Sequence, residues 1–355
     1  TRRDIGTVLQ ADVEDIKRAL ETTHGVFLSW KNTPAEERAA ALDKMADLME
    51  EDLPALMALL TREGGKTHVD GIAEVREAVD FCRYYAAEGR KHFADNGHAL
   101  PGPTGESNRL YMEGRGVFLC ISPWNFPLAI FLGQVAAALM AGNCVIAKPA
   151  GQTCLIAMRA VELLIKAGIP KNVIAFLPVS GRLAGAHLVT DERVAGVCMT
   201  GSTETAQTIN KTLAERKGAI VPLIAETGGQ NAMIADSSAL PEQIVDDVIT
   251  SAFRSAGQRC SALRVLFVSD SIADKVIAML AGACKELTLA DPIHLSTDIG
   301  PVIDKGSLEG LTEHAARMTK EAKLVAQVDA GPDTSHGTFF APRAFEIKSM
   351  GILTK

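Results

Sequence analysis

Cys260 lies in the stretch SAGQRCSALR, residues 255–264, between the cation of Arg259 and the hydroxyl of Ser261. Most of the other cysteines lie in apolar, strand-like contexts. A nearby guanidinium favours the thiolate, which is the reactive form of cysteine. Cys260 is therefore a candidate nucleophile. The alternative is a buried apolar side chain with polar neighbours, and no histidine lies near it in sequence to act as its base.

Two polar residues lie at or just after the end of a short β-rich run. Asn125 lies in SPWNFP, residues 122–127, where two prolines stiffen the chain, and a rigidly held amide could donate to a developing oxyanion. The alternative role for Asn125 is a helix cap. Lys148 ends the run CVIAK and could pair with ribose or phosphate oxygens, or it could be an ordinary lysine that reaches solvent.

Two further candidates follow later runs. Thr200-Gly201-Ser202 opens a helix whose free N–H groups could meet a pyrophosphate, although such turns are often small for geometric reasons. Glu226 precedes two glycines, and a carboxylate in a cleft can have a raised pKa and act as a base. Most glutamates are merely solvated.

The elements that must position these residues alternate between strands and helices. Strand-like runs at 116–122, 144–148, 173–177, 195–199 and 219–224 are separated by helical segments, which predicts an α/β fold with a doubly wound parallel sheet. A second block of two strands and two helices follows Glu226, with one helix predicted over 241–255. We place the domain boundary near 224, which gives domains 1–224 and 225–355.

The first part of the chain reads as helices. Thr33-Pro34-Ala35-Glu36 predicts a capping box with proline at the first helical position. Gly64-Gly65 predicts the end of the next helix.

Composition excludes several classes of function. The net charge is −7 and no Lys/Arg block is present, so nucleic acid is not an expected partner. The longest apolar run, residues 128–140, is interrupted and too short to span a bilayer. The 7 cysteines show no CxxC pairing and the 8 histidines form no HExxH motif, which favours reduced thiols in the cytoplasm and no metal site. The dinucleotide fingerprint GxGxxG is absent.

Taken together, these motifs resemble the aldehyde dehydrogenase superfamily over essentially the whole chain. Asn125 in PWNFP, Lys148 in AKPA, Gly201-Ser202, Glu226 in ETGGQN and Cys260 in GQRC occur in the order of that family and roughly at its spacing. The segments AETGGQNAMI and SAFRSAGQRCSALRV, with REAVDFCRYYA upstream, are most similar to the dehydrogenase domain of bifunctional proline-utilisation proteins. The resemblance implies an NAD(P)-binding domain at 1–224 and a catalytic domain at 225–355.

The resemblance implies oxidation of L-glutamate γ-semialdehyde, the open form of Δ1-pyrroline-5-carboxylate, to glutamate with NAD. The Cys260 thiolate would attack the aldehyde, and the Asn125 amide with the Cys260 N–H would hold the oxyanion. Loss of hydride to the nicotinamide would leave a thioester, which water activated by Glu226 would hydrolyse. Ser261 would help to hold the substrate's α-carboxylate, and Arg259 would add positive potential there.

The resemblance also implies a cofactor site and partners. The expected cofactor-binding residues are Ser122, Pro123, Trp124, Lys148, Gly151, Gly181, Gly185, Thr200, Gly201 and Ser202. We expect no metal, and we expect the full-length parent to be a homo-oligomer with a proline dehydrogenase domain that carries FAD.

Two departures from the family pattern qualify this interpretation. Family members that prefer NAD commonly carry glutamate where this chain has Gly151, so we expect a reduced NAD preference and NADP as a usable cofactor. The chain also ends before the family's Glu-x-Phe-Gly-Pro segment, so we expect a fragment of a longer polypeptide with doubtful full activity. The alternatives are a dehydrogenase for another semialdehyde, a cofactor-binding remnant without turnover, and a cysteine hydrolase.

Overall fold

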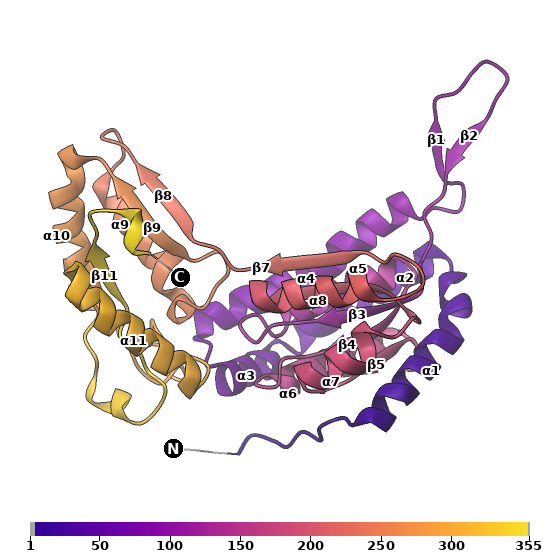
Figure 1. Ribbon diagram of the computed structural model, residues 1–355, viewed down its shortest axis with the longest axis horizontal. Helices are drawn as coiled ribbons and strands as arrows, with labels where there is room; N and C mark the ends of the chain where they lie inside the picture. The colour runs from indigo at the N-terminus through magenta and orange to yellow at the C-terminus, as the bar shows by residue number, and fades with distance from the viewer. Residues whose placement is uncertain (1–3, 354–355) are drawn as a thin grey trace. The chain divides into compact units, whose positions relative to one another are not determined.

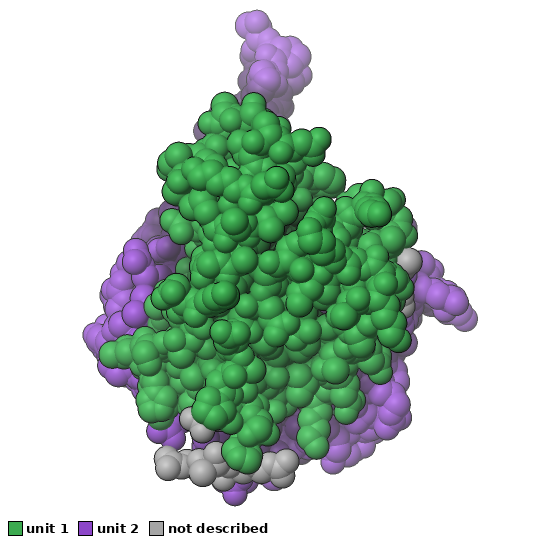
Figure 2. Space-filling view, turned by 90° about the vertical axis from the view of Figure 1, so that its left-hand side faces the viewer, with its two compact units in different colours: residues 1–3, 65–71, 228–355 green, residues 4–64, 72–227 purple. Residues whose placement is uncertain are grey.

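The computed structural model describes residues 4–353, which form two compact units, coloured separately in Figure 2. Residues 4–64 and 72–227 form the larger unit. Residues 65–71 and 228–353 form the smaller unit. The helix α4 (His68–His92) therefore begins in the smaller unit and continues in the larger one.

The larger unit is built on a parallel sheet of five strands in the order β5-β4-β3-β6-β7 (Figure 1). All neighbouring strands in it are parallel. Its strands are β3 (Val117–Ile121), β4 (Cys144–Lys148), β5 (Ile174–Phe176), β6 (Val194–Gly201) and β7 (Leu223–Thr227). Every residue of β4 is buried, as expected for a strand covered on both faces. The predicted α/β fold with a doubly wound sheet is confirmed.

Two groups of helices cover the sheet. In one group α1 packs on β3 and β4 and contacts η1, which in turn contacts α8. In the other, α5 packs on β3 and β4 and contacts α6, while α2 packs on both of these helices. The bounds are α1 (Val13–Lys31), α2 (Ala35–Glu51), α3 (Leu53–Gly64), α5 (Ala129–Met140), α6 (Cys154–Ala167), α7 (Gly181–Ala184), η1 (Gly185–Val189) and α8 (Thr203–Glu215). A hairpin of β1 (His98–Leu100) and β2 (Asn108–Leu110) projects from this unit (Figure 1).

The capping box predicted at residues 33–36 is wrong. Pro34 occupies the N-cap of α2 and makes no side-chain capping bond. Thr33 Oγ1 instead donates to Ser29 O at the end of α1, and Glu36 forms an ion pair with Arg90. The predicted end at Gly64-Gly65 is confirmed, because α3 ends at Gly64 and Gly65 has a φ of 66°.

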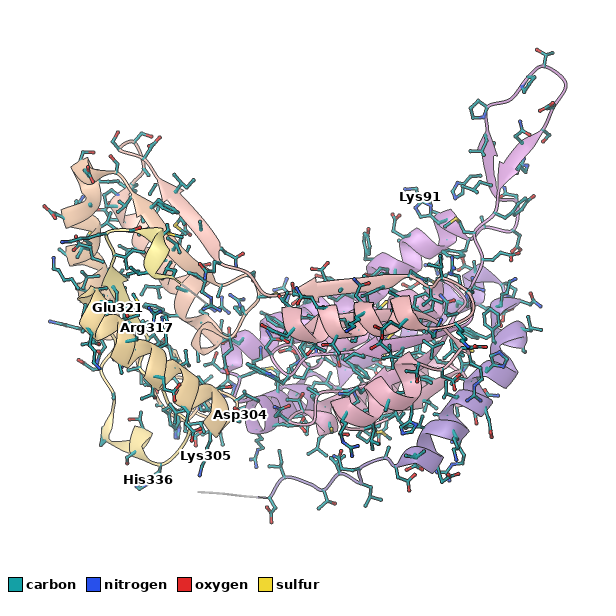
Figure 3. All side chains as sticks on the ribbon, in the orientation of Figure 1. Lys91, Asp304, Lys305, Arg317, Glu321 and His336 are labelled. Atoms are coloured by element: carbon teal, nitrogen blue, oxygen red, sulfur yellow. The ribbon has the colours of Figure 1, made fainter. Side chains whose placement is uncertain are left out.

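The smaller unit contains a parallel pair of strands and an antiparallel pair. The strands are β8 (Asn231–Ala235), β9 (Leu263–Val268), β10 (Lys323–Gln327) and β11 (Arg343–Glu346). The helices are α9 (Pro241–Val248), η2 (Ile249–Phe253), η3 (Arg254–Gly257), α10 (Asp270–Glu286), α11 (Lys305–Glu321), η4 (Pro332–Ser335) and η5 (Met350–Ile352). The Asp304 carboxylate caps α11, and an Arg317–Glu321 ion pair closes its last turn (Figure 3). Because β8 and β9 are parallel and α9 lies between them in the sequence, the smaller unit contains a βαβ unit of its own.

Among the described helices, none has both the length and the apolar composition that crossing a bilayer requires. Within residues 4–353, no cluster of three or more His, Cys, Asp or Glu side chains is placed to hold a metal ion.

Candidate active site

In the larger unit, the strand register brings three of the predicted site residues to one edge of the sheet. Lys148 and Met199 both pair with Ile121, from opposite sides of β3. Thr200, the next residue of β6, pairs with Glu226 of β7. Since these strands are parallel, their carboxyl ends lie at the same edge, which is where doubly wound sheets bind ligands.

The turn that carries Asn125 follows β3 and is fixed at both ends. At its beginning Ser122, which is buried, donates from its backbone N to Lys148 O over 3.1 Å. At its end the carboxylate of the fully buried Glu74 accepts from Leu128 N over 2.9 Å. Pro123, Trp124 and Asn125 between them are partly buried. The N-cap of α5 is Leu128, three residues beyond Asn125, so the structure does not assign that cap position to Asn125.

Lys148 is buried at the end of β4, with a relative exposure of 9%. Its Nζ donates to Pro149 O over 3.0 Å. Burial lowers the pKa of Lys148 because the charged ammonium loses its hydration, and nearby Cys154 opposes this effect. The Lys148 side chain is therefore largely withdrawn from solvent, and its role at a cofactor site stays a prediction. An ammonium desolvated in this way would gain from an anionic partner.

The turn after β6 is ordered by side chains. Thr200 Oγ1 accepts from Gln134 Nε2 over 3.0 Å. Ser202 is the N-cap of α8, where its Oγ accepts from Thr205 N over 3.2 Å. The Ser202 hydroxyl therefore has a structural role, and the remaining N–H groups of the first turn of α8 are the donors that an anion could use.

Three glycines expected at the cofactor site, Gly151, Gly181 and Gly185, share one property. A Cβ added to any of them would meet nothing within 4 Å. Packing therefore does not require glycine at these positions, and each has room for a ligand or a side chain. Gly201 is tighter, because a Cβ there would lie 3.1 Å from the Met199 methyl carbon.

Glu226 lies on the edge strand β7 and is exposed. The glycines that follow it at 228 and 229 are exposed as well. An exposed carboxylate at the carboxyl edge of the sheet is accessible to water, as a hydrolytic base must be.

In the smaller unit, Cys260 is exposed, whereas the other six cysteines are buried. Burial raises the pKa of Cys82 and of Cys144 to about 12, and that of Cys284 to about 11. These three thiols are inert at neutral pH, because the thiolate is the reactive form. The alternative reading of Cys260 as a buried hydrophobe is wrong.

Side chains hold the backbone of the loop that carries Cys260. Asn231 Nδ2 donates to Cys260 O over 2.7 Å and to Ala262 O over 3.0 Å. Arg264 Nη2 donates to Gly257 O over 2.9 Å and to Arg259 O over 3.3 Å. Arg259 is partly buried and Ser261 is exposed. The loop thus presents a thiol, a hydroxyl and a cation in consecutive positions on a fixed backbone.

Sequence reasoning missed Glu74 and Asn231. Asn231 stands in the quoted motif ETGGQN, so it could have been found as a polar residue that opens a strand. Glu74 carried no comparable signal, because an acidic residue within a helical segment usually faces solvent.

A match to the aldehyde dehydrogenase family covers residues 1–352. Bifunctional protein PutA from Klebsiella aerogenes is 48% identical over 99% of this chain and 26% of its own length. A solved variant of proline utilization A from Bradyrhizobium japonicum is 55% identical with a TM-score of 0.94, over 98% of this chain and 35% of that one. The 1-pyrroline-5-carboxylate dehydrogenase from Thermus, solved with bound NAD, is 30% identical with a TM-score of 0.89, over 95% of this chain and 65% of that one.

The chain belongs to the aldehyde dehydrogenase family, a family of oxidoreductases. Within that family its relatives include bifunctional PutA proteins and 1-pyrroline-5-carboxylate dehydrogenases. The chain spans about a quarter of the length of the PutA protein from Klebsiella aerogenes.

Proposed function

We propose that this chain carries the dehydrogenase chemistry of proline catabolism, the oxidation of L-glutamate γ-semialdehyde to L-glutamate with NAD or NADP. The observation that carries the proposal is Cys260, the exposed member of a set of otherwise buried cysteines, on a loop held by Asn231 and Arg264. The similarity to dehydrogenases named for 1-pyrroline-5-carboxylate supports the choice of substrate. The proposal includes a parent that also carries a proline dehydrogenase domain with FAD, which the bifunctional relatives support. It also includes a homo-oligomeric state of that parent.

In the proposed mechanism the Cys260 sulfur adds to the aldehyde carbon, and the carbonyl oxygen becomes an oxyanion. The Cys260 N–H and the Asn125 amide are the proposed donors to that oxygen, and one such donor is worth about 3–4 kcal/mol in other enzymes. The hemithioacetal then loses a hydride and becomes a thioester. Glu226 takes a proton from water, the hydroxide adds to the thioester, and the Cys260 thiolate leaves as the acid forms.

The residues of the larger unit suit a nicotinamide dinucleotide. When bound, that group supplies the hydride acceptor. The buried ammonium of Lys148 and the first-turn N–H groups of α8 are cationic or donor groups of the kind that phosphate and ribose oxygens need. Gly151, Gly181 and Gly185 leave space beside the backbone. Ser122, Pro123, Trp124, Thr200, Gly201 and Ser202 complete the proposed cofactor contacts.

The substrate contacts are proposed for the smaller unit. Ser261 offers its exposed hydroxyl to the substrate carboxylate, and Arg259 offers positive charge. Both residues adjoin the nucleophile, so a bound carboxylate would fix the distance between the aldehyde and the thiol.

The test compares NADH formation from glutamate semialdehyde by the wild-type chain and by Cys260→Ala. A matched control is Cys284→Ala, which removes a fully buried thiol from the same unit. We expect the Cys260 variant to lose at least a thousandfold in kcat and the Cys284 variant to stay within about threefold, because removal of a covalent nucleophile leaves only residual catalysis. Turnover by Cys260→Ala at the wild-type rate would refute the proposed mechanism. Cofactor binding without turnover in any of the three would support the alternative of a binding remnant.

A further inference from the structure

The segment that precedes Cys260, residues 255–257, has a left-handed backbone conformation that residues with a side chain rarely adopt. Ser255, Ala256 and Gly257 have φ values of 54°, 53° and 69°. Glycine takes such values freely, whereas Ser255 and Ala256 carry a Cβ and take them at a cost. Among the described residues these two are the only non-glycine residues with positive φ. Such strained conformations persist only where the surroundings hold them.

The group that holds this backbone is Asp70, whose side chain is 3% exposed. Its Oδ2 accepts from Ser255 N over 3.1 Å. Its Oδ1 accepts from Arg254 Nη2 over 3.0 Å and from Nε over 3.2 Å. Asp70 therefore binds two successive residues at the beginning of the strained stretch, although it precedes Arg254 by 184 positions in the sequence.

Other bonds tie down the far end of the stretch. Gln258 Nε2 donates to Ser255 O over 3.1 Å, and its Oε1 accepts from Ile303 N over 2.9 Å. Arg264 Nη2 donates to Gly257 O over 2.9 Å. The strained segment is therefore anchored at each end, and Cys260 follows it by two residues. Asp70 is the buried anchor at its beginning.

We propose that Asp70 and Arg254 form a clamp that positions the nucleophile loop, residues 254–260, and thereby the thiol and backbone N–H of Cys260. The expected effect of the clamp on turnover rests on the proposed function. Its effect on the order of the loop stands independently. Asp70 and Arg254 are positioning residues, since both act through the loop.

The bonding pattern specifies which substitutions break the clamp. Both Asp70 oxygens face donors, because Oδ2 also accepts from Thr67 Oγ1 over 3.1 Å. In Asp70→Asn one oxygen becomes an NH2 group, so a donor faces either Arg254 or the pair of Ser255 N and Thr67 Oγ1. Arg254→Lys keeps the charge and loses the two-pronged bond, so it is the partial variant.

The experiment measures turnover and backbone exchange on the full chain. Asp70→Asn is compared with Arg254→Lys and with Glu242→Gln, which removes an exposed ion pair with Lys275 in the same unit. We expect Asp70→Asn to lower kcat at least tenfold with KM changed less than threefold, Arg254→Lys to lie in between, and Glu242→Gln to match wild type. Hydrogen exchange should accelerate at least tenfold in peptides that cover residues 253–262 in Asp70→Asn, and stay unchanged in peptides of β10 and β11.

The two readouts separate the clamp from the proposed function. Faster exchange throughout the smaller unit would show a general structural role and overturn the clamp, as would unchanged loop exchange in Asp70→Asn. If the wild-type chain shows no turnover with glutamate semialdehyde, the proposed function fails, while accelerated exchange confined to residues 253–262 still supports the clamp. Turnover that stays at the wild-type value despite a loosened loop would refute the positioning of Cys260.

Discussion

Gly151 is a residue of the proposed cofactor site that has room for a side chain. It is exposed, its φ is not positive, and a Cβ there would meet nothing within 4 Å. A side chain can therefore begin at this position without a clash at its Cβ. The family resemblance places glutamate here in proteins that prefer NAD, because a carboxylate can bond the ribose hydroxyls and repels a 2′-phosphate.

Gly151→Glu should accordingly raise the ratio of kcat/KM for NAD to that for NADP by about tenfold, which corresponds to about 1.4 kcal/mol. The matched control is Gln152→Glu, which adds the same charge one position along. Steady-state kinetics with both cofactors give the ratio for each variant. An equal change in the two variants would show a general charge effect, and no change in Gly151→Glu would place residue 151 outside the cofactor site.

At the residue scale the sequence was informative where chemistry leaves a local signature. The polar neighbours of Cys260 distinguish it from the other cysteines, most of which lie in apolar contexts, and the structure exposes Cys260 and buries the other six. The family resemblance predicts a cofactor contact for Ser202, and the structure shows that its hydroxyl caps α8. Asp70 and Glu74 left no signature, since a helical acidic residue becomes a buried anchor only through contacts with residues far away in the sequence.

At the element scale, the beginning of α5 depends on Glu74. This carboxylate is fully buried and accepts from Leu128 N over 2.9 Å and from Ala129 N over 3.4 Å. It satisfies N–H groups that the first turn of a helix cannot pair internally. It also fixes the end of the turn that carries Asn125.

Glu74→Ala should lower the free energy of unfolding by about 1–3 kcal/mol, because buried N–H groups lose their acceptor. Glu74→Gln keeps an acceptor oxygen and should cost less. Asp80→Ala on the exposed side of the same helix is the control and should stay within about 0.5 kcal/mol. Urea unfolding curves measure all three. A cost for Glu74→Ala no larger than that for Asp80→Ala would show that Glu74 does not stabilise the beginning of α5.

Element types were predictable from periodicity, whereas element ends depended on local chemistry. The strand expected over 219–224 is β7 at Leu223–Thr227, because Pro222 cannot donate a ladder hydrogen bond. The helix expected over 241–255 ends as an α-helix at Val248 and continues through η2 and η3. The change from α-helix to η2 and η3 leads into the strained backbone at residues 255–257. The sequence of this segment is regular and does not indicate the change.

At the scale of the whole molecule, the division of the chain is discontinuous. Residues 65–71 belong with 228–353, partly because Asp70 binds Arg254 and Ser255 and because Gly300 packs against Gly65 O. Composition and periodicity change gradually along a chain, so they predict one boundary, near 224. Composition and periodicity therefore do not predict that the short segment 65–71 joins the smaller unit, because tertiary contacts determine this.

The distribution of cysteines across both units gives a prediction about the whole folded chain. Six of the seven cysteines are buried and Cys260 is exposed. Burial raises the pKa of Cys82, Cys144, Cys154 and Cys284. A hydrogen bond between Cys120 and Cys198 is the chief cause that raises the pKa of Cys120 and lowers that of Cys198. Cys198 is 9% exposed, so a reagent reaches it only through local opening of the sheet.

Titration with a chromogenic disulfide reagent should therefore show one fast thiol per native chain and seven in guanidinium chloride. Cys260→Ser should abolish the fast phase, and Cys198→Ser should leave it intact. A fast phase that survives in Cys260→Ser and disappears in Cys198→Ser would identify the pair in the parallel sheet as the reactive site. That outcome would contradict the nucleophile role proposed for Cys260, because this role rests on Cys260 being the accessible cysteine.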